Sequence, residues 1–101
     1  IKIDGEVPDS YRLFENYPNP FNSSTKVRFG IPAGFDKSEV TVKVIDLSGR
    51  QVAVLVDSIL QPGKYEVQWD AGNLPSGVYY CKLSAGSRGE IGETLKMVLV
   101  K

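Results

Sequence analysis

The stretch KYEVQW, residues 64–69, decides the fold because apolar and polar side chains alternate along it. Tyr65, Val67 and Trp69 would share one side of an extended chain, with charged or amide side chains on the other. Successive side chains of a β-strand point to opposite faces of the sheet. The stretch therefore predicts a strand with one buried face and one solvated face.

The same alternation recurs toward the N-terminus. One further strand is predicted over TKVRFGI, residues 25–31, with inward positions Val27, Phe29 and Ile31. Another is predicted over residues 40–47, with inward positions Val40, Val42 and Val44. In this second strand Ile45 and Leu47 place apolar groups on the opposite face, so we expect it to bend or to be covered on both sides.

Three stretches are apolar on both faces and predict central strands: residues 51–56, 77–83 and 95–100. Within residues 77–83, Tyr79, Cys81 and Leu83 fall on one side. Residues 11–14 add a weak edge strand, which brings the expected number of strands to about seven.

Turn residues separate these strands. Gly49 in LSGR, residues 47–50, predicts a tight hairpin, and Pro62-Gly63 has the residue order of a type II turn. Residues 85–89, AGSRG, predict another hairpin. We find no helical apolar spacing over 11 residues or more. Short strands with regular turn signals predict an all-β, immunoglobulin-like antiparallel β-sandwich that lacks the Cys-Trp-Cys pattern of antibody domains.

The domain boundaries follow from the N-terminal sequence. IKIDGEVPDS, residues 1–10, mixes charged residues, glycine and proline without an apolar period. We interpret it as a linker or arm, and residues 11–101 as the sandwich. Because the sequence opens at Ile1 and not at a methionine, we expect a piece of a longer protein with a cargo part upstream.

The composition excludes several classes of function. Twelve Lys and Arg balance twelve Asp and Glu, so there is no charge excess to attract nucleic acid or an anionic membrane. The longest aliphatic run, residues 52–56, is far too short to cross a bilayer. With one cysteine and no histidine, we expect no zinc, haem or iron–sulfur cofactor.

Catalysis is not predicted either. A serine or cysteine nucleophile would lack its usual histidine base, and Cys81 falls on an inward position where a thiol acts as a small apolar side chain. The nearest carboxylate pairs are Glu66 with Asp70 and Glu90 with Glu93, which we interpret as solvated charge. Residues 70–76 fit no calcium-ligand spacing and are expected to form a turn. The sequence predicts a domain that is not an enzyme.

Residues 16–22, NYPNPFN, are the most unusual stretch. Two prolines stiffen it, its asparagines can cap turns, and Tyr17 and Phe21 can attach it to the sandwich. Tyr11, Tyr17 and Tyr80 are the tyrosines expected outside the core, which leaves a glycan-stacking surface as an alternative. The plain interpretation is a rigid loop clamped to the core.

Several motifs together resemble one family. They are NYPNPFN at 16–22, Ser24-Thr25, VIDLSGRQV at 44–52, Gly63, Trp69-Asp70, LPSGVYY at 74–80 and KMVLVK at 96–101. In this order they are similar to the type A C-terminal sorting domain of the bacterial type IX secretion system, from about Pro8 to Lys101. A related Ig-like domain in flagellar hook-cap proteins shares the NPF and SGVY text and would imply assembly scaffolding.

The resemblance implies an immunoglobulin-like domain at the end of proteins exported across the outer membrane of Bacteroidetes-type bacteria, to the cell surface or beyond. The secretion translocon would read it as an address. A surface sortase-type protease would then remove it and could attach the cargo to lipopolysaccharide. The resemblance assigns the recognition motifs to Asn19, Pro20, Phe21, Asp46, Gly49, Arg50, Gly77, Tyr79, Lys96, Val98, Val100 and Lys101.

Two alternatives and two structural questions stay open. The alternatives are a glycan-binding accessory module of an extracellular polysaccharide-degrading enzyme and a purely structural spacer. Leu95, Met97 and Leu99 look like core residues, so the terminal strand could be required for folding and not read directly. The edge at residues 11–14 leaves room for a weak dimer through strand pairing.

Overall fold

The computed structural model describes residues 2–4, 7–33, 38–86 and 91–101, and every regular element in these ranges is a β-strand. The strands are β1 (Lys2–Asp4), β2 (Arg12–Leu13), β3 (Ser24–Ile31), β4 (Ser38–Ile45), β5 (Gln51–Leu60), β6 (Gly63–Asp70), β7 (Gly77–Ala85) and β8 (Ile91–Leu99). None of the described elements is a helix able to span a membrane.

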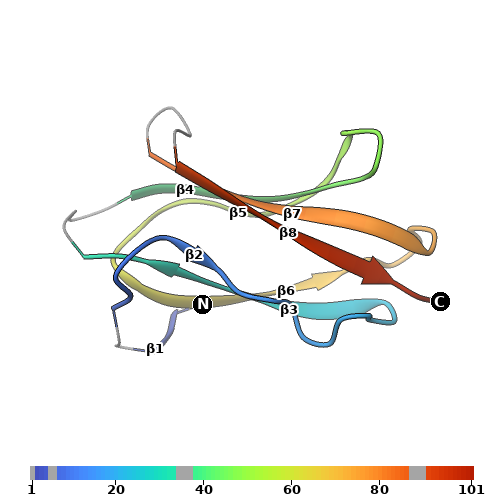
Figure 1. The fold of residues 1–101 in the computed structure, drawn as a ribbon, viewed down its shortest axis with the longest axis horizontal. Coiled ribbons are helices and arrows are strands. Elements are labelled where there is room, and N and C mark those ends of the chain that lie inside the picture. Colours follow the sequence, from blue (N-terminus) through green and yellow to red (C-terminus); the bar gives the residue numbers. More distant parts are fainter. Residues whose placement is uncertain (1, 5–6, 34–37, 87–90) are drawn as a thin grey trace.

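The strands form two four-stranded antiparallel sheets packed face to face (Figure 1). One sheet has the order β1-β6-β3-β2 and the other the order β5-β4-β7-β8. The chain crosses between the sheets after β3, after β5 and after β6, which is how an immunoglobulin-like sandwich is wound. The predicted fold class is confirmed.

The core lies between the sheets and contains the predicted inward residues. Alternate residues of β3, β4 and β7 face it, and all three inward valines of β4 are 1% exposed or less. Tyr65 and Trp69 of β6 are also buried. Cys81 is fully buried, and burial raises the pKa of its thiol to about 12, so it packs as a small apolar group. The main buried side chains are Phe21, Val27, Phe29, Ile31, Val40, Val42, Val44, Tyr65, Trp69, Tyr79, Cys81, Leu83, Met97 and Leu99.

Two of the three predicted central strands are wrong in position. β7 is central, but β5 and β8 are the two edges of their sheet. The second apolar face of β5 is only partly covered, and Val54 is 46% exposed. The edge of β8 is covered near its end by the loop that contains Phe21, which forms a parallel bridge with Leu99. In β5 and β8, a sequence that is apolar on both faces therefore belongs to an edge strand. One such strand is partly covered by a loop, and the other is partly open to solvent.

The strand predicted over residues 40–47, which was expected to bend or to be covered on both sides, is irregular where its pattern changes. The pairing of β4 with β5 shifts register between Val42 and Lys43 and again between Val44 and Ile45, which marks irregularities of the bulge type. Leu47 lies beyond the second shift, at the tip of the hairpin, and is 71% exposed. The apolar side chain of Leu47 is therefore exposed to solvent and not covered.

The N-terminal residues include one element that the sequence did not predict. Within the expected arm, β1 pairs with β6 at Tyr65 and Lys64, so this part of the chain extends a sheet edge. The weak edge strand at residues 11–14 is observed as β2, which pairs with Phe29 and Gly30 of β3. The tip of the predicted 85–89 hairpin lies outside the described residues, while β7 and β8 pair as its two arms.

Candidate recognition site at one end of the sandwich

The motif residues gather at one end of the sandwich, at the right of Figure 1. Strand register brings them together: Ile45 pairs with both Gln51 and Tyr80, and Leu99 pairs with Gly77 and bridges to Phe21. We name this region the motif end and define it as residues 19–22, 46–50, 75–79 and 96–101. Motifs spread along the sequence thus form one surface.

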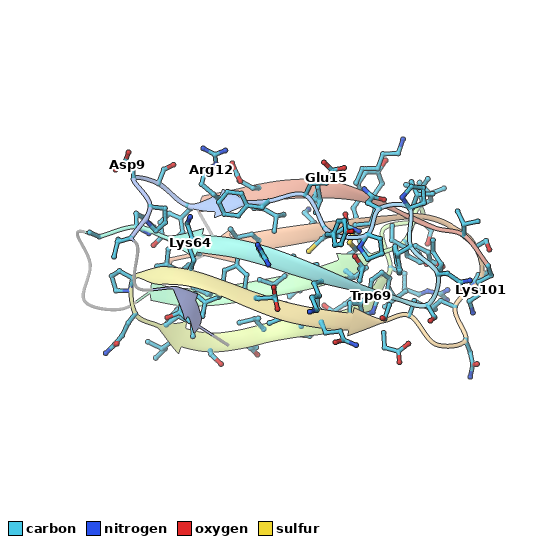
Figure 2. The ribbon with its side chains drawn as sticks, turned by 90° about the horizontal axis from the view of Figure 1, so that it is seen from below. Asp9, Arg12, Glu15, Lys64, Trp69 and Lys101 are labelled. Carbon is cyan, nitrogen blue, oxygen red and sulfur yellow. The ribbon has the colours of Figure 1, made fainter. Side chains whose placement is uncertain are left out.

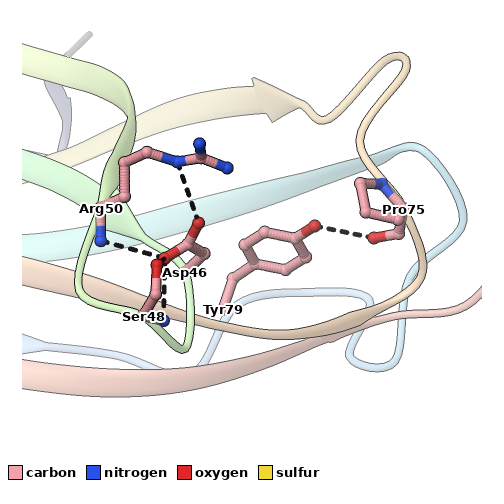
Figure 3. A network of polar contacts seen from close by, with 5 residues as sticks. All are labelled: Asp46, Ser48, Arg50, Pro75 and Tyr79. Carbon is pink, nitrogen blue, oxygen red and sulfur yellow. Dashed lines mark hydrogen bonds and ion pairs between the residues drawn. The ribbon is translucent and has the colours of Figure 1, made fainter.

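The hairpin between β4 and β5 is built around Asp46. Its Oδ1 accepts hydrogen bonds from the Ser48 amide at 3.0 Å, the Ser48 hydroxyl at 2.6 Å and the Arg50 amide at 3.0 Å (Figure 3). Its Oδ2 lies 3.3 Å from Arg50 Nε. The Ser48 hydroxyl, followed by the Arg50 amide, lowers the pKa of the Asp46 carboxyl. Gly49 has φ 87°, which only glycine adopts readily, so Asp46 and Gly49 together fix this tip.

Tyr79 holds the start of β7. Its hydroxyl donates to the Pro75 carbonyl at 2.7 Å, as Figure 3 shows. A tyrosine near the start of this strand, bonded to the backbone a few residues upstream and two residues before a cysteine position, is the tyrosine corner of immunoglobulin-like sandwiches. Gly77 lies between the partners with φ 156°. Tyr79 is therefore a structural anchor, and Cys81 stands where antibody domains carry their second bridge cysteine.

The NPF loop is tied to the last strand by four hydrogen bonds. Asn19 Oδ1 accepts from the Val98 amide at 3.0 Å, and Asn19 Nδ2 donates to the Lys96 carbonyl at 3.3 Å. The Phe21 amide donates to the Val98 carbonyl at 2.9 Å, and the Val100 amide donates to the Phe21 carbonyl at 2.9 Å. The loop thus closes the edge of β8 at the motif end.

An aromatic cluster lies beneath this surface and joins three motifs. The rings of Phe21 and Trp69 are 5.5 Å apart, and those of Trp69 and Tyr79 are 5.6 Å apart in an edge-to-face arrangement. All three side chains are at most 4% exposed. Such pairs add to the stabilisation that comes from burial of apolar area. The NPF, WD and SGVY motifs therefore share one piece of the core.

A shallow pocket lies between two exposed parts of the motif end. It has a volume of about 250 Å³ and is lined by Asp46, Leu47, Ser48 and residues 76–79. The chain end lies beside the same loop, because the Lys101 amide donates to the Ser76 hydroxyl at 2.9 Å and Lys101 Nζ donates to the Gly72 carbonyl. Residues of both the 46–50 and the 76–79 motifs line this pocket.

The predicted site residues divide by exposure. Phe21 and Tyr79 are buried, whereas Asn19, Asp46, Gly77 and Val98 are partly buried. The exposed members are Pro20, Gly49, Arg50, Lys96, Val100 and Lys101. Met97 and Leu99 are core residues and Leu95 packs against the core, so the terminal strand has a structural role.

Three contributions to the motif end were not predicted. Leu47 and Ser76 line the pocket. The only sequence signal for Leu47 is that it is an apolar residue in a hairpin tip, and there is none for Ser76. Asn16 is 2% exposed and donates to Thr25 Oγ1 at 3.1 Å and to the Pro18 carbonyl at 3.2 Å, which fixes the NYPNPFN stretch from inside. Both Tyr17-Pro18 and Asn19-Pro20 peptide bonds are cis.

The polar groups elsewhere form pairs and turns. Glu66 accepts a 2.9 Å hydrogen bond from Arg28 Nε, and Asp70 Oδ1 accepts from the Gly72 amide at 3.0 Å in the predicted turn at 70–76. Glu90 lies outside the described residues. Among the residues that the structure describes, there is no group of three His, Cys, Asp or Glu side chains placed to hold a metal. The geometry offers surfaces for recognition.

These observations define the class as an immunoglobulin-like domain with a motif-built surface at one end. The family described as the secretion system C-terminal sorting domain matches residues 15–99, and the chain belongs to this family. Its members are signals of the type IX system. The domain is accordingly a non-catalytic C-terminal sorting signal for export across the outer membrane to the cell surface or extracellular space.

Two solved structures from Porphyromonas gingivalis share the fold. The chain of PorZ, an essential surface component of the type IX secretion system, matches with a TM-score of 0.57 and 18% identity over 92% of this chain. The chain of dimeric latent PorU matches with a TM-score of 0.67 and 22% identity over 97% of this chain. The present chain spans only 12% and 10% of those chains. Comparison with curated proteins gave no match.

Proposed function

We propose that the type IX translocon recognises the exposed part of the motif end, and that the buried motif residues hold this surface in shape. The pocket shared by the 46–50 and 76–79 motifs carries the proposal, because two separate stretches of the family sequence line it together. Leu47 lines the pocket and is 71% exposed, and the exposed Arg50 side chain is ion-paired with Asp46 of the same lining. An apolar group next to an oriented cation is a small surface that a receptor can bind specifically.

Export of a reporter tests this proposal. The 101-residue chain is attached to a periplasm-directed reporter in a bacterium with a type IX system, and reporter in the medium or on the surface is measured. Leu47→Ser and Arg50→Ala should each lower export strongly while the domain stays folded, because an exposed ion pair stabilises by only about 0–1 kcal/mol. Matched controls are Val54→Ser and Lys43→Ala, which change an exposed apolar residue and an exposed cation of the same sheet outside the motif end.

The outcome separates recognition from folding. Unfolding curves followed by Trp69 fluorescence show whether each variant is folded, since Trp69 is 4% exposed in the native state. Retention of the wild-type fusion in the periplasm would contradict the sorting role itself. Wild-type export with equal behaviour of the Leu47, Arg50 and control variants would contradict only the recognised surface.

The terminal strand contributes in two ways on this proposal. Met97 and Leu99 are 0% and 1% exposed, so truncation of the last residues removes core and stops export by unfolding. Val100 is 52% exposed and Lys101 is held by Ser76, so these two can also be read directly. Val100→Ser in the folded domain distinguishes the two contributions: reduced export with unchanged unfolding supports direct reading.

We propose that the junction with the cargo lies in residues 1–10 and that the surface sortase-type protease cleaves the chain within this segment. The support is position: Lys2–Asp4 pairs with β6 at Tyr65 and Lys64, and Figure 1 shows β1 toward the end of the sandwich away from the motif end. Cleavage there would release the cargo and leave the recognised surface intact. Mass spectrometry of the exported reporter checks this, since peptides from residues 11–101 should be missing from mature cargo and present in the periplasmic precursor.

A further inference from the structure

A groove on the outer face of the β3–β6 sheet lies outside the motif end. Figure 2 views this side of the molecule, with Arg12, Glu15 and Lys64 labelled. The groove has a volume of about 400 Å³, and its lining includes Phe14, Tyr17, Lys26, Arg28, Lys64 and Glu66. The sorting role as proposed above uses none of these side chains, so the groove needs a separate account.

Tyr17 supplies an exposed aromatic ring on a backbone that is held in place. Its amide donates to the Lys26 carbonyl at 3.0 Å and its carbonyl accepts from the Lys26 amide at 2.9 Å, so the backbone is held at the edge of β3. The side chain is nevertheless 80% exposed. A large exposed ring on a fixed backbone contributes little to the core and offers a stacking surface.

Basic side chains are arranged next to this ring. Arg28 Nε binds Glu66 Oε1 at 2.9 Å, and Lys26 Nζ lies 3.9 Å from Glu66 Oε2. The Arg28 and Lys26 side chains remain 61% and 57% exposed. Glu66 therefore orients two cations whose outer surfaces face solvent, as a site for a charge-assisted hydrogen bond requires.

Two more basic side chains lie near the ring of Phe14, farther along the groove. Arg12 Cζ lies 5.6 Å and Lys64 Nζ 5.9 Å from the centroid of its ring, within the range of cation–π contacts. With Lys26 and Arg28, four basic side chains line or adjoin the groove against the two carboxylates of Glu15 and Glu66. The charge balance favours an anionic ligand.

We propose that this groove binds a pyranose that carries a carboxylate, such as a uronic acid unit of an extracellular polysaccharide. The apolar face of the sugar ring would stack on Tyr17, and its carboxylate would pair with Arg28 and Lys26. Both parts of the site are then used: a neutral sugar would leave the cations unused, and an acidic peptide would not need the exposed ring. A pocket with aromatic walls and a few placed polar groups suits such a ligand.

Titration of the 101-residue chain with oligogalacturonate, followed by NMR or calorimetry, tests this site. Binding should weaken by roughly tenfold or more in Tyr17→Ala and in Arg28→Gln, and should weaken as salt is raised. Tyr17→Phe keeps the ring and should keep the affinity. Lys43→Gln removes an exposed cation from the other sheet and serves as the charge control.

Three results would overturn the proposal. They are absence of oligogalacturonate binding to the wild-type chain, equal binding of a neutral galactose oligomer, and equal binding of a poly-glutamate peptide that is insensitive to Tyr17→Ala. The last would identify an acidic-peptide surface. None of them bears on export, which the reporter assay measures separately, and intact Trp69 fluorescence confirms that each variant is folded.

Discussion

Two tyrosines, Tyr65 near the start of β6 and Tyr79 near the start of β7, fix the backbone in the same way. The Tyr65 hydroxyl donates to the Gln61 carbonyl and the Tyr79 hydroxyl to the Pro75 carbonyl, each at a distance of 2.7 Å. In both cases a glycine with positive φ stands two residues before the tyrosine, at 147° for Gly63 and 156° for Gly77. The local geometry of the two corners is thus nearly identical, and any difference in role must come from their surroundings.

Those surroundings differ clearly. Tyr65 stacks on Phe29 of the neighbouring strand, with centroids 5.4 Å apart and planes at 13°, and burial raises the pKa of its hydroxyl. Tyr79 meets Trp69 edge-on, and Trp69 in turn contacts Phe21 of the loop that closes β8. The first corner supports a sheet junction, whereas the second is joined to the sorting motifs. The family motifs therefore include Tyr79 and its ring partners, whereas the first corner contributes only Gly63 to them.

The largest expected effects come from the ring that each corner depends on. Phe21→Ala and Phe29→Ala should each lower the free energy of unfolding by about 3–5 kcal/mol, because both side chains are at most 2% exposed. Denaturant unfolding followed by Trp69 fluorescence measures this loss. Equal losses would show that the two ends contribute equally to stability.

Amide hydrogen exchange separates these two variants. The Val98 and Val100 amides are hydrogen-bonded to Asn19 and Phe21 of the loop, so they should exchange faster in Phe21→Ala. In Phe29→Ala, their protection should fall only by as much as the global stability falls. Matching exchange in both variants would contradict the idea that the aromatic cluster holds the loop on β8.

The two glycines give the next effect. Gly63→Ala and Gly77→Ala should each destabilise by about 1–3 kcal/mol, because side-chain-bearing residues rarely adopt these φ values. At Gly77 no atom lies within 4 Å of an added Cβ, so the loss there is conformational. Gly72→Asn is the control, since its φ of 52° is one that asparagine tolerates. In thermal unfolding, Gly72→Asn should have a clearly higher Tm than Gly63→Ala and Gly77→Ala.

The sequence predicts the sandwich well because its signals are local. Alternation identifies β3, β4 and β6, and the inward residues of these strands are buried as expected except for Val67, which is partly buried. The predicted hairpin at Gly49 is present with positive φ. Pro62-Gly63 was also identified as a change of direction, although there the chain passes from one sheet to the other.

Strand order and the motif end could not be predicted in the same way. β5 and β8 were expected to be central because both faces are apolar, but a pattern along one strand carries no information about its neighbours. The bonds from Asn19 and Phe21 to β8 join residues at opposite ends of the sequence. Such contacts exist only after the sheets pack, and resemblance to a family was the single sequence signal that grouped them.

Removal of the corner hydroxyls should have smaller effects. Tyr65→Phe and Tyr79→Phe each delete one hydrogen bond and should cost about 1 kcal/mol of stability. Export should fall only for Tyr79→Phe, because Pro75 then loses its tie next to the pocket. If Tyr65→Phe reduces export as much at the same stability, the reporter assay is responding to folding alone and the comparison fails.

The smallest effect concerns the charged hairpin beside the second corner. The Ser48 and Arg50 hydrogen bonds lower the pKa of Asp46 below its usual value of 3.8, so the folded state releases this proton more readily than the unfolded chain. The resulting stabilisation is present above the unfolded pKa and is lost as pH falls through the folded pKa. Asp46→Asn should therefore be less stable than wild type at neutral pH, with the difference shrinking below about pH 4.

Unfolding curves between neutral and acidic pH measure that difference, and Asp57→Asn on the exposed edge strand β5 is the matched control. A gap between Asp46→Asn and wild type that persists at the lowest pH would mean that the carboxyl acts through shape and not through charge. In that case the asparagine amide has failed to reproduce the turn. The exposed tip with Leu47 and Arg50 would then owe its position to the hydrogen-bond pattern of Asp46, whatever its protonation.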